Sequence, residues 1–421
     1  MLTWFYRILL FWLLFGISAL FWGGNQIHPL LTISTNLAGL LAASLPLLFL
    51  FRYPPAYKVI AWLISLGVVG LILESLYLHG QYMYSFFVVK RFAYPGLALL
   101  TYYVATKADV PKLNLSYAVN LIFVFFVFDQ FVLGRMYSYA LTNESRTTSA
   151  YESFYMVLPF TYFLVNYVRL GKRLDLLKAL GTFGLIVFLL HRSVITTAVM
   201  AGLLVFFLSS IGRVAGSQFK IGKTVSTLLI LGLLGLPFLS LINPAKLAGF
   251  TETIAGILAP EKDETGSWRL EQSQYYMKQF AERPLLGWRY EGYDRGEIMA
   301  NEDFPDKGTI IHSQYVDMLY NYGALGLAFN LFVALSTLLY LYLRNPVFTP
   351  EQTVLFGFIV GGLLFGFSYQ LPVFYWSFVG LGMYYGQVGL PRLRRVRPYA
   401  DMPGHLVPYE APIHSTPQNH D

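Results

Sequence analysis

The sequence predicts an all-α integral membrane protein with about twelve transmembrane helices and one large, partly helical outer loop. Of its 421 residues, 56% are hydrophobic and only 13% are charged, whereas soluble domains carry about 25% charged residues. Aromatic residues make up 17% of the chain, and many Trp and Tyr residues lie near the ends of apolar runs, as in interfacial belts. The chain has no cysteine, which excludes disulfides and thiolate metal sites.

Apolar runs locate the predicted spans, because a transmembrane helix needs roughly 20 mostly apolar residues. The runs lie near residues 5–22, 29–51, 59–78, 84–105, 115–134, 152–168, 175–190, 194–211, 224–243, 313–343, 352–369 and 372–389. Only Arg7 precedes the core of the first run, and no small-residue cleavage site follows, so we expect a retained anchor rather than a signal peptide. We expect nine helices within 1–243, an outer loop at 244–312, three helices within 313–390 and a disordered cytoplasmic tail at 391–421.

The distribution of basic residues predicts the orientation. With the N-terminus in the cytoplasm, 17 of the 30 Lys and Arg residues lie on the cytoplasmic side and five lie in short outer loops. The other eight lie in 244–311, which carries little topological weight because long segments translocate largely regardless of charge. We therefore expect both termini in the cytoplasm and the long loop in the periplasm of a Gram-negative cell, or its equivalent. The formal charge of +7 is spread over loops and tail, which favours a topology signal over a nucleic-acid-binding surface.

Two predicted spans are irregular. A helix long enough to cross at 84–105 places Lys90 and Arg91 inside the outer leaflet. These two side chains either snorkel to the headgroups or form a cationic site for a lipid phosphate, since ionisable groups at membrane depth are usually functional. Glu74, on the preceding span, is a candidate partner for them. The span 313–343 is overlong, and we expect it to tilt or to project from the membrane.

The outer loop contains a predicted amphipathic helix. Between Trp268 and Arg283, apolar and aromatic residues recur with polar residues between them, which is typical of a helix lying on a membrane or protein surface. Pro284 ends this helix, and the sequence Pro-Leu-Leu-Gly-Trp then turns the chain. A long ordered loop on a membrane scaffold is a common place for function.

Three residues of the outer side suit group-transfer chemistry. Arg192 follows His191 in a very short outer turn, Arg269 opens the amphipathic helix, and His312 ends the loop. Arginine holds phosphate oxygens through its planar fork, and histidine accepts a proton near neutral pH. Together they are suited to holding a diphosphate leaving group and activating an alcohol. The structural alternatives are a headgroup anchor for Arg192, a solvated helix charge for Arg269 and a hydrogen-bonded structural residue for His312.

A polar stripe follows His312 on the next predicted helix. Ser313, Asp317 and Asn321 lie at i, i+4 and i+8 and descend about two turns into the membrane. Asp317 lies about 140° round the helix from His312, so it is poorly placed to orient that ring. We expect its partner to be an arginine on another span.

No motif indicates a metal or cofactor site. The sequence contains no HExxH, no GxxxxGK[ST], no GxGxxG after a strand and no nucleophile elbow. We therefore expect neither a metal nor a cofactor.

The motif around His312 resembles the hallmark of the O-antigen ligase and polymerase family of bacterial glycan enzymes. That hallmark is a His followed by Asn, Ser or Gln, about nine residues and then Gly-x-x-Gly, where a large periplasmic loop enters a membrane helix. Here it reads His312-Ser313, nine residues, and Gly323-Ala-Leu-Gly326. We expect the two glycines to allow close helix packing rather than to take part in chemistry.

Two further segments resemble the same family. The sequence HRSVITTA matches the family's short turn and places its first arginine at Arg192, and the segment 266–288 matches its loop helix and places the second arginine at Arg269. The resemblance is close over roughly residues 180–345. Residues 288–290, Trp-Arg-Tyr, stand where the family often has a Gly-x-Gly run.

The resemblance implies a GT-C-like, metal-independent, inverting glycosyltransferase in the bacterial inner membrane, with its active site on the periplasmic side. Arg192 and Arg269 would bind the diphosphate of an undecaprenyl-diphosphate-linked glycan, and His312 would act as general base on the acceptor hydroxyl. The charge of the arginines would matter most as negative charge grows on the departing diphosphate.

The nature of the acceptor separates the predicted functions. A ligase, the first choice, transfers the glycan to a sugar of lipid A–core, and a polymerase transfers it to a second lipid-linked glycan. A lipid-linked glycan transporter is the alternative from another class. Lys90, Arg91, Arg289 and Asp317 are further candidate contacts to substrate or to lipid phosphate. The expected partners are these lipids, with no nucleic acid among them.

Overall fold

The computed structural model is helical and describes residues 2–22, 28–108, 115–133, 148–218, 222, 264–294 and 311–387. These residues belong to one compact unit, Met1–Gly389. Within the described ranges, extended pairing is limited to a single parallel bridge between Val214 and Phe348. The helices are α1 (Leu2–Phe11), η1 (Trp12–Gly16), η2 (Ala19–Trp22), α2 (Pro29–Leu48), η3 (Leu50–Arg52), α3 (Pro55–His79), α4 (Phe86–Ala93), α5 (Gly96–Ala108), α6 (Leu115–Val127), η5 (Phe128–Val132), α8 (Ala150–Tyr155), α9 (Val157–Leu170), α10 (Arg173–Phe188), α11 (Arg192–Ser210), α14 (Glu264–Phe280), α15 (Arg289–Asp294), α17 (Gln314–Arg344), α18 (Pro350–Phe365) and α19 (Val373–Gln387).

The helical spans identify a multi-pass membrane protein, as the sequence predicts. Five helical segments are long and apolar enough to cross a membrane: Pro29–Leu48, Pro55–His79, Leu115–Val132, Arg192–Ser210 and Gln314–Arg344. Shorter apolar helices occupy Leu2–Gly16 and Pro350–Phe365. Helices lie in eleven of the twelve predicted ranges, and the range 224–243 lies outside the described residues. The total of twelve spans, the domain limits and the orientation stay predictions, and the tail 391–421 also lies outside the described residues.

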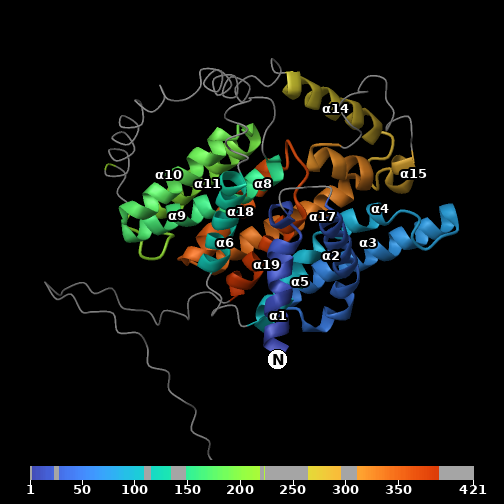
Figure 1. Cartoon of the computed structure of the whole chain (residues 1–421). Coiled ribbons are helices and arrows are strands. Elements are labelled where there is room, and N and C mark those ends of the chain that lie inside the picture. Colours follow the sequence, from blue (N-terminus) through green and yellow to red (C-terminus); the bar gives the residue numbers. More distant parts are fainter. Residues whose placement is uncertain are drawn as a thin grey trace, which may run out of the picture. The chain divides into compact units, whose positions relative to one another are not determined.

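Helix α19 lies at the centre of the packing. It contacts α5, α17, α18 and η1, while α9 packs on α10, α11 and α18, and α2 packs on α3, α4 and α5. Helix α14 contacts α17, and α15 contacts both α17 and α4 (Figure 1). The two loop helices therefore rest on the same long helix that begins beside His312.

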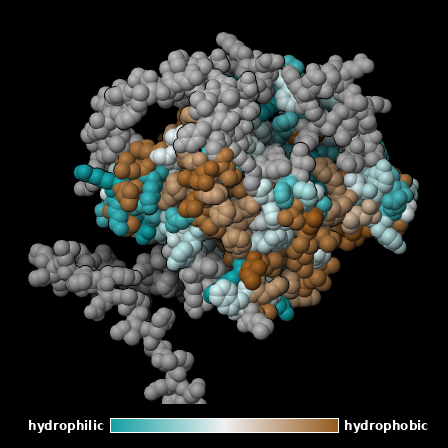
Figure 2. All heavy atoms as spheres, in the orientation of Figure 1, coloured by the Kyte–Doolittle hydropathy of each residue, from teal (hydrophilic) through white to brown (hydrophobic). Residues whose placement is uncertain are grey.

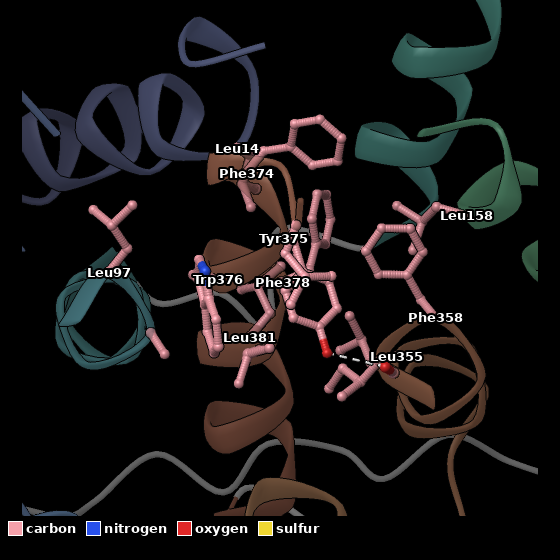
Figure 3. Packing of buried hydrophobic residues seen from close by; sticks show 14 of the residues in the cluster. Leu14, Leu97, Leu158, Leu355, Phe358, Phe374, Tyr375, Trp376, Phe378 and Leu381 are labelled. Atoms are coloured by element: carbon pink, nitrogen blue, oxygen red, sulfur yellow. Dashed lines mark hydrogen bonds between the residues drawn. The ribbon is translucent and has the colours of Figure 1, made fainter. Parts of the chain in front are cut away.

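Aromatic residues of α19 fill the space between its neighbours. Phe374, Tyr375 and Phe378 are buried among residues of η1, α9 and α18, and Trp376 lies on the side of α19 that faces α5 (Figure 3). The Tyr375 hydroxyl donates a 3.0 Å hydrogen bond to the carbonyl of Ile359, which satisfies the one polar atom that this ring carries into the core.

The outer surface of several helices is also apolar. On α3, Trp62, Leu66 and Leu73 are exposed, although other residues of the same helix are buried. Apolar side chains cover much of the visible face, with polar residues gathered around α9 and α10 (Figure 2). Helices that are apolar on all sides are typical of membrane spans, and these exposed side chains are suited to contact with lipid.

The predicted span 84–105 is divided into two helices. Helix α4 ends at Ala93 and α5 begins at Gly96, with Pro95 between them, whose ring and missing N–H prevent a continuous helix. A Cβ atom on Gly96 would lie 2.4 Å from the carbonyl oxygen of Ala42, so glycine allows α5 to approach the backbone of α2. The short α4 carries Lys90 and Arg91 on its last turn.

The overlong helix α17 contains a break at Gly323. This residue has φ 67° and ψ −170°, a conformation that essentially only glycine adopts. The break separates the short segment that begins two residues after His312 from the long apolar remainder. That this overlong helix tilts or projects from the membrane stays a prediction.

Candidate active site

His312 lies between the loop helix α14 and the start of α17. Its backbone N–H donates to the side-chain oxygen of Gln272 on α14 at 3.3 Å. Its ring meets the Trp268 ring edge-on, with the centroids 4.8 Å apart. Ser313 caps α17 by accepting a hydrogen bond from the N–H of Val316. A favourable N-cap residue therefore fixes the helix start beside the imidazole.

The connection between α18 and α19 holds the backbone on both sides of His312. The side chain of Gln370 donates to the carbonyl of Ile311 at 2.7 Å. The N–H of Leu371 donates to the side chain of Gln314 at 2.9 Å, and the N–H of Gln314 donates to the carbonyl of Gly366 at 2.9 Å. We call residues 366–372 the α18–α19 corner.

Arg269 and His312 converge at Tyr369, in the same corner. The guanidinium of Arg269 donates to the Tyr369 hydroxyl at 2.8 Å and lies 4.5 Å from the centre of the ring. The rings of Tyr369 and His312 are 6.4 Å apart, and Phe365 stacks on Tyr369 at 5.1 Å. The predicted convergence is thus present for these two residues, with an aromatic ring between them.

Arg192 is the first residue of α11. Leu190, with φ 57°, turns the chain before it, and the buried His191 makes a 2.9 Å hydrogen bond to the carbonyl of Thr148. Helix α11 packs on α8, whose Tyr151 ring lies 5.9 Å from that of Tyr369. The approach of Arg192 to the other two site residues stays a prediction.

The turn after α14 docks on the break in α17. The N–H of Ala324 donates to Pro284 at 2.8 Å, that of Leu325 donates to Leu285 at 3.2 Å, and that of Trp288 donates to Tyr320 at 2.9 Å. The backbone groups freed by the break therefore find partners in the turn, as buried polar groups require.

Two glycines make this backbone contact sterically possible. A Cβ on Gly323 would lie 2.3 Å from the carbonyl of Leu285. Gly287 has φ 67°, and its Cβ would lie 2.6 Å from the nitrogen of Gly323. The prediction that Gly323 serves helix–helix packing is therefore wrong, because it packs against the loop turn.

A family comparison covers this same arrangement. Residues 177–331 match the Wzy_C family model, described as O-antigen ligase. The chain contains an O-antigen ligase domain. The matched stretch begins in α10, includes Arg192, Arg269 and His312, and ends in α17 beyond the docked turn. No curated protein matches the chain.

The domain match confirms the predicted resemblance. A chain with this domain is a membrane glycosyltransferase-like enzyme of O-antigen ligase or polymerase type, which acts on lipid-linked glycans.

An aromatic cluster secures the outer loop of the O-antigen ligase domain. Tyr276, Trp288, Ile311 and Tyr320 pack together and are buried. Burial, reinforced by neighbouring tyrosines, raises the pKa of Tyr276, so its hydroxyl stays neutral at physiological pH. The cluster joins α14, the docked turn and α17 just below His312.

Asp317 has the arginine partner that the sequence predicts. Arg91 on α4 lies 2.7 Å from its carboxylate, and the two side chains are 10% and 1% exposed. Asn321 adds a 2.9 Å hydrogen bond to the same carboxylate. Lys90 donates to Asn36 at 2.8 Å. The buried Arg91–Asp317 pair ties the short helix α4 to the segment of α17 that precedes the break.

Glu74 does not serve as the partner of Lys90 or Arg91, and that prediction is wrong. Its carboxylate lies 2.5 Å from the Nε atom of Arg289, which joins α15 to the outer end of α3. Arg289, a candidate substrate contact, is therefore ion-paired with a residue of α3, outside the matched residues 177–331. Among the described residues, His, Asp and Glu form no group of three that would hold a metal ion.

Several residues of the site were not singled out by the sequence. Gln272, Tyr369 and Gln370 hold His312 and Arg269, and Tyr151 lies beside Tyr369. Tyr369 and Gln370 lie in a segment between two apolar helices, ahead of Pro372, and they carry no motif. The sequence feature that could have indicated them is the interruption of an apolar stretch by polar residues at these positions.

Proposed function

We propose that this protein is an O-antigen ligase that moves a glycan from undecaprenyl diphosphate to a sugar hydroxyl of lipid A–core at the periplasmic face. The convergence of Arg269 and His312 at Tyr369, within the O-antigen ligase domain, carries this proposal. The reaction is metal-independent, because arginine side chains supply the positive charge that the departing diphosphate needs.

The proposed step is a single displacement. A ring nitrogen of His312 accepts the proton of the acceptor hydroxyl as its oxygen attacks the anomeric carbon. The bond between that carbon and the diphosphate oxygen breaks, and undecaprenyl diphosphate leaves with the electron pair. Arg192 and Arg269 hold the diphosphate, and the anomeric configuration is inverted because the attack comes from the opposite side.

A gel profile of cell-surface lipopolysaccharide tests the proposal. The host lacks its own copy and carries the wild-type protein or no protein. A ligase predicts that the deletion removes capped lipopolysaccharide while polymer accumulates on the lipid carrier. Core carrying a single repeat without a ladder would instead identify a polymerase. An unchanged covalent product together with altered lipid translocation would identify a transporter.

The arginine roles lead to a second measurement. Replacing Arg192 or Arg269 with alanine is expected to lower the transfer rate by about 100-fold, the usual effect of losing one stabilising group at a developing charge. The rate is measured with purified protein and lipid-linked donor. Lysine at either position should restore part of the rate, because it keeps the charge and loses the fork. Full transfer by both alanine variants at normal expression contradicts the diphosphate clamp.

A membrane-facing groove is suited to the long hydrocarbon chain of the carrier. A cavity of about 1110 Å³ runs between α3 and α17 and is lined mainly by apolar side chains. Leu286 of the docked turn and the Glu74–Arg289 pair lie among its lining residues. A glycine, Gly70, leaves open space in it, since a Cβ there would meet nothing within 4 Å. We include this groove in the proposal as the place of the isoprenoid chain.

A larger side chain in the groove tests whether the groove holds the isoprenoid chain of the donor. Gly70→Leu is expected to raise the KM for the lipid-linked donor about tenfold while kcat changes little, because it obstructs binding outside the reacting centre. Gly184→Leu on α10 is the matched control, since a Cβ at Gly184 also meets nothing within 4 Å. Equal donor KM values for the two variants would place the chain elsewhere.

A further inference from the structure

A second cavity lies beside the α18–α19 corner. It has a volume of about 260 Å³ and is bounded by the chain after η1, by α2, α4 and α8, and by the start of α19. Phe87 of α4, which is 39% exposed, belongs to its lining. Its volume is slightly below the range of about 300–1,000 Å³ found for sites that enclose a whole small ligand. It is therefore suited to one ring of a longer molecule.

The cavity and the candidate active site share a wall. Gln370 lines the cavity and also donates to the carbonyl of Ile311, next to His312. Tyr151 lines it too, and the Tyr151 ring lies 5.9 Å from that of Tyr369, which holds Arg269. Gln370 therefore separates the cavity from the backbone beside His312, and Tyr151 together with Tyr369 separates it from Arg269.

Charges around the cavity balance. Lys90 and Arg91 line it, but Arg91 is neutralised by Asp317. Glu152 also lines the cavity, and its carboxylate accepts the backbone N–H of Ser149 at 3.2 Å. The two cations are thus balanced by Glu152 of the lining and by Asp317, which pairs with Arg91. This balance does not favour a phosphate over a neutral ligand.

Polar groups of both kinds surround the cavity together with aromatic faces. Lys90, Gln370 and Tyr151 can donate hydrogen bonds, whereas Glu152 can accept them. The Phe87 ring, with Arg91 4.9 Å from its centroid, adds an apolar wall. A sugar ring carries hydroxyls that both donate and accept and has apolar C–H faces, so it complements this lining.

We propose that this cavity binds a sugar ring of the acceptor and presents the adjoining hydroxyl toward His312. The proposal rests on the proposed transferase function. In the proposed function Arg269 holds the diphosphate. Arg269 and Tyr369 lie on one side of the shared wall, so we assign the cavity on the other side to the acceptor. The cavity would thereby contribute to selection of the acceptor sugar.

A filled cavity tests the assignment. Thr35 of α2 lines the cavity, and its hydroxyl donates to Thr32 of the same helix, so Thr35→Phe adds volume while removing only that local bond. Thr32→Phe is the matched control, because Thr32 is exposed and bonds within its own helix. Thr35→Phe is expected to raise the acceptor KM at least about tenfold, with the donor KM unchanged. Thr32→Phe should behave as wild type.

Direct binding separates this assignment from the transferase function. Wild-type protein in nanodiscs should bind a core oligosaccharide freed of its lipid, and Thr35→Phe should bind it at least about tenfold more weakly. Lys90→Met keeps the side-chain volume and removes a hydrogen-bond donor, so it should also weaken oligosaccharide binding. This variant serves as the test if Thr35→Phe fails to fold. A protein that binds the oligosaccharide in this way but transfers nothing would retain the cavity proposal and lose the transferase function.

Other results would overturn the cavity proposal. The proposal is contradicted if the acceptor KM and the oligosaccharide binding are unchanged in both Thr35→Phe and Lys90→Met. It is also contradicted if only the donor KM rises. Weaker binding of vesicles rich in phosphatidylglycerol by Lys90→Met, with unchanged oligosaccharide binding, would identify a lipid-phosphate site instead.

Discussion

Replacing His312 with alanine is expected to lower the transfer rate by roughly 1,000-fold, within the range of 10²- to 10⁴-fold attributed to general acid–base catalysis. The imidazole is the proposed proton acceptor, and the backbone bonds to Gln272 and Gln370 that position it do not depend on the ring. The variant should therefore fold and still bind the lipid-linked donor. Single-turnover transfer and donor binding, measured on the same purified sample, check this.

Two further measurements sharpen this result. Added imidazole should restore part of the rate of His312→Ala, because a small base can occupy the vacated space. His28→Asn is the control, since His28 caps α2 through its ring nitrogen and asparagine caps a helix well; its rate should equal that of wild type. A His312→Ala rate within a factor of about two of wild type would remove this residue as the base.

Replacing Gly323 with alanine is expected to detach the docked turn and abolish most transfer. The residue would have to adopt a conformation costing about 1–3 kcal/mol for a non-glycine. Its Cβ would also lie 2.3 Å from the backbone of Leu285, where nothing flexible can move aside. We expect a loss of at least about 100-fold, because the cluster of Tyr276 and Tyr320 that lies below His312 would separate. Transfer rate and protease cleavage near Pro284 measure the two consequences.

Gly287 packs against the backbone of Gly323, so variants of both glycines test this prediction further. Gly287→Ala should cause a similar loss, and the double variant should lose little more, because either change already breaks the same contact. Gly181→Ala on α10, where a Cβ meets nothing within 4 Å, should leave transfer unchanged. Protease resistance equal to that of wild type in Gly323→Ala would show that the turn does not depend on this contact.

Apolar periodicity predicted where helices lie but not how they are interrupted. Runs of apolar residues located α2, α3 and α17 because a span must be apolar along its whole length. The break between α4 and α5 at Pro95 and the break at Gly323 arise from backbone chemistry at single residues. The break at Gly323 also needs partners from a distant segment, Pro284 and Leu285, which the local sequence does not indicate.

Site residues with distinctive chemistry were predictable, whereas their supports were not. Arg269 and His312 were identified because of their chemistry and position, and Asp317 was expected to pair with an arginine of another helix. Glu74 was assigned to the wrong cations, because the rotation of one helix against another is absent from a single sequence. Tyr369 and Gln370 were missed, since their roles depend on contacts that lie 100 and 59 positions away in the chain, respectively.

The α18–α19 corner holds two parts of the candidate active site through adjacent residues. Its consecutive residues Tyr369 and Gln370 bind the guanidinium of Arg269 and the carbonyl beside His312. A small molecule that shifted this corner would therefore displace both groups together. Resistance would then be difficult to acquire, because a substitution that repels the molecule must also rebuild two anchoring bonds from adjacent positions.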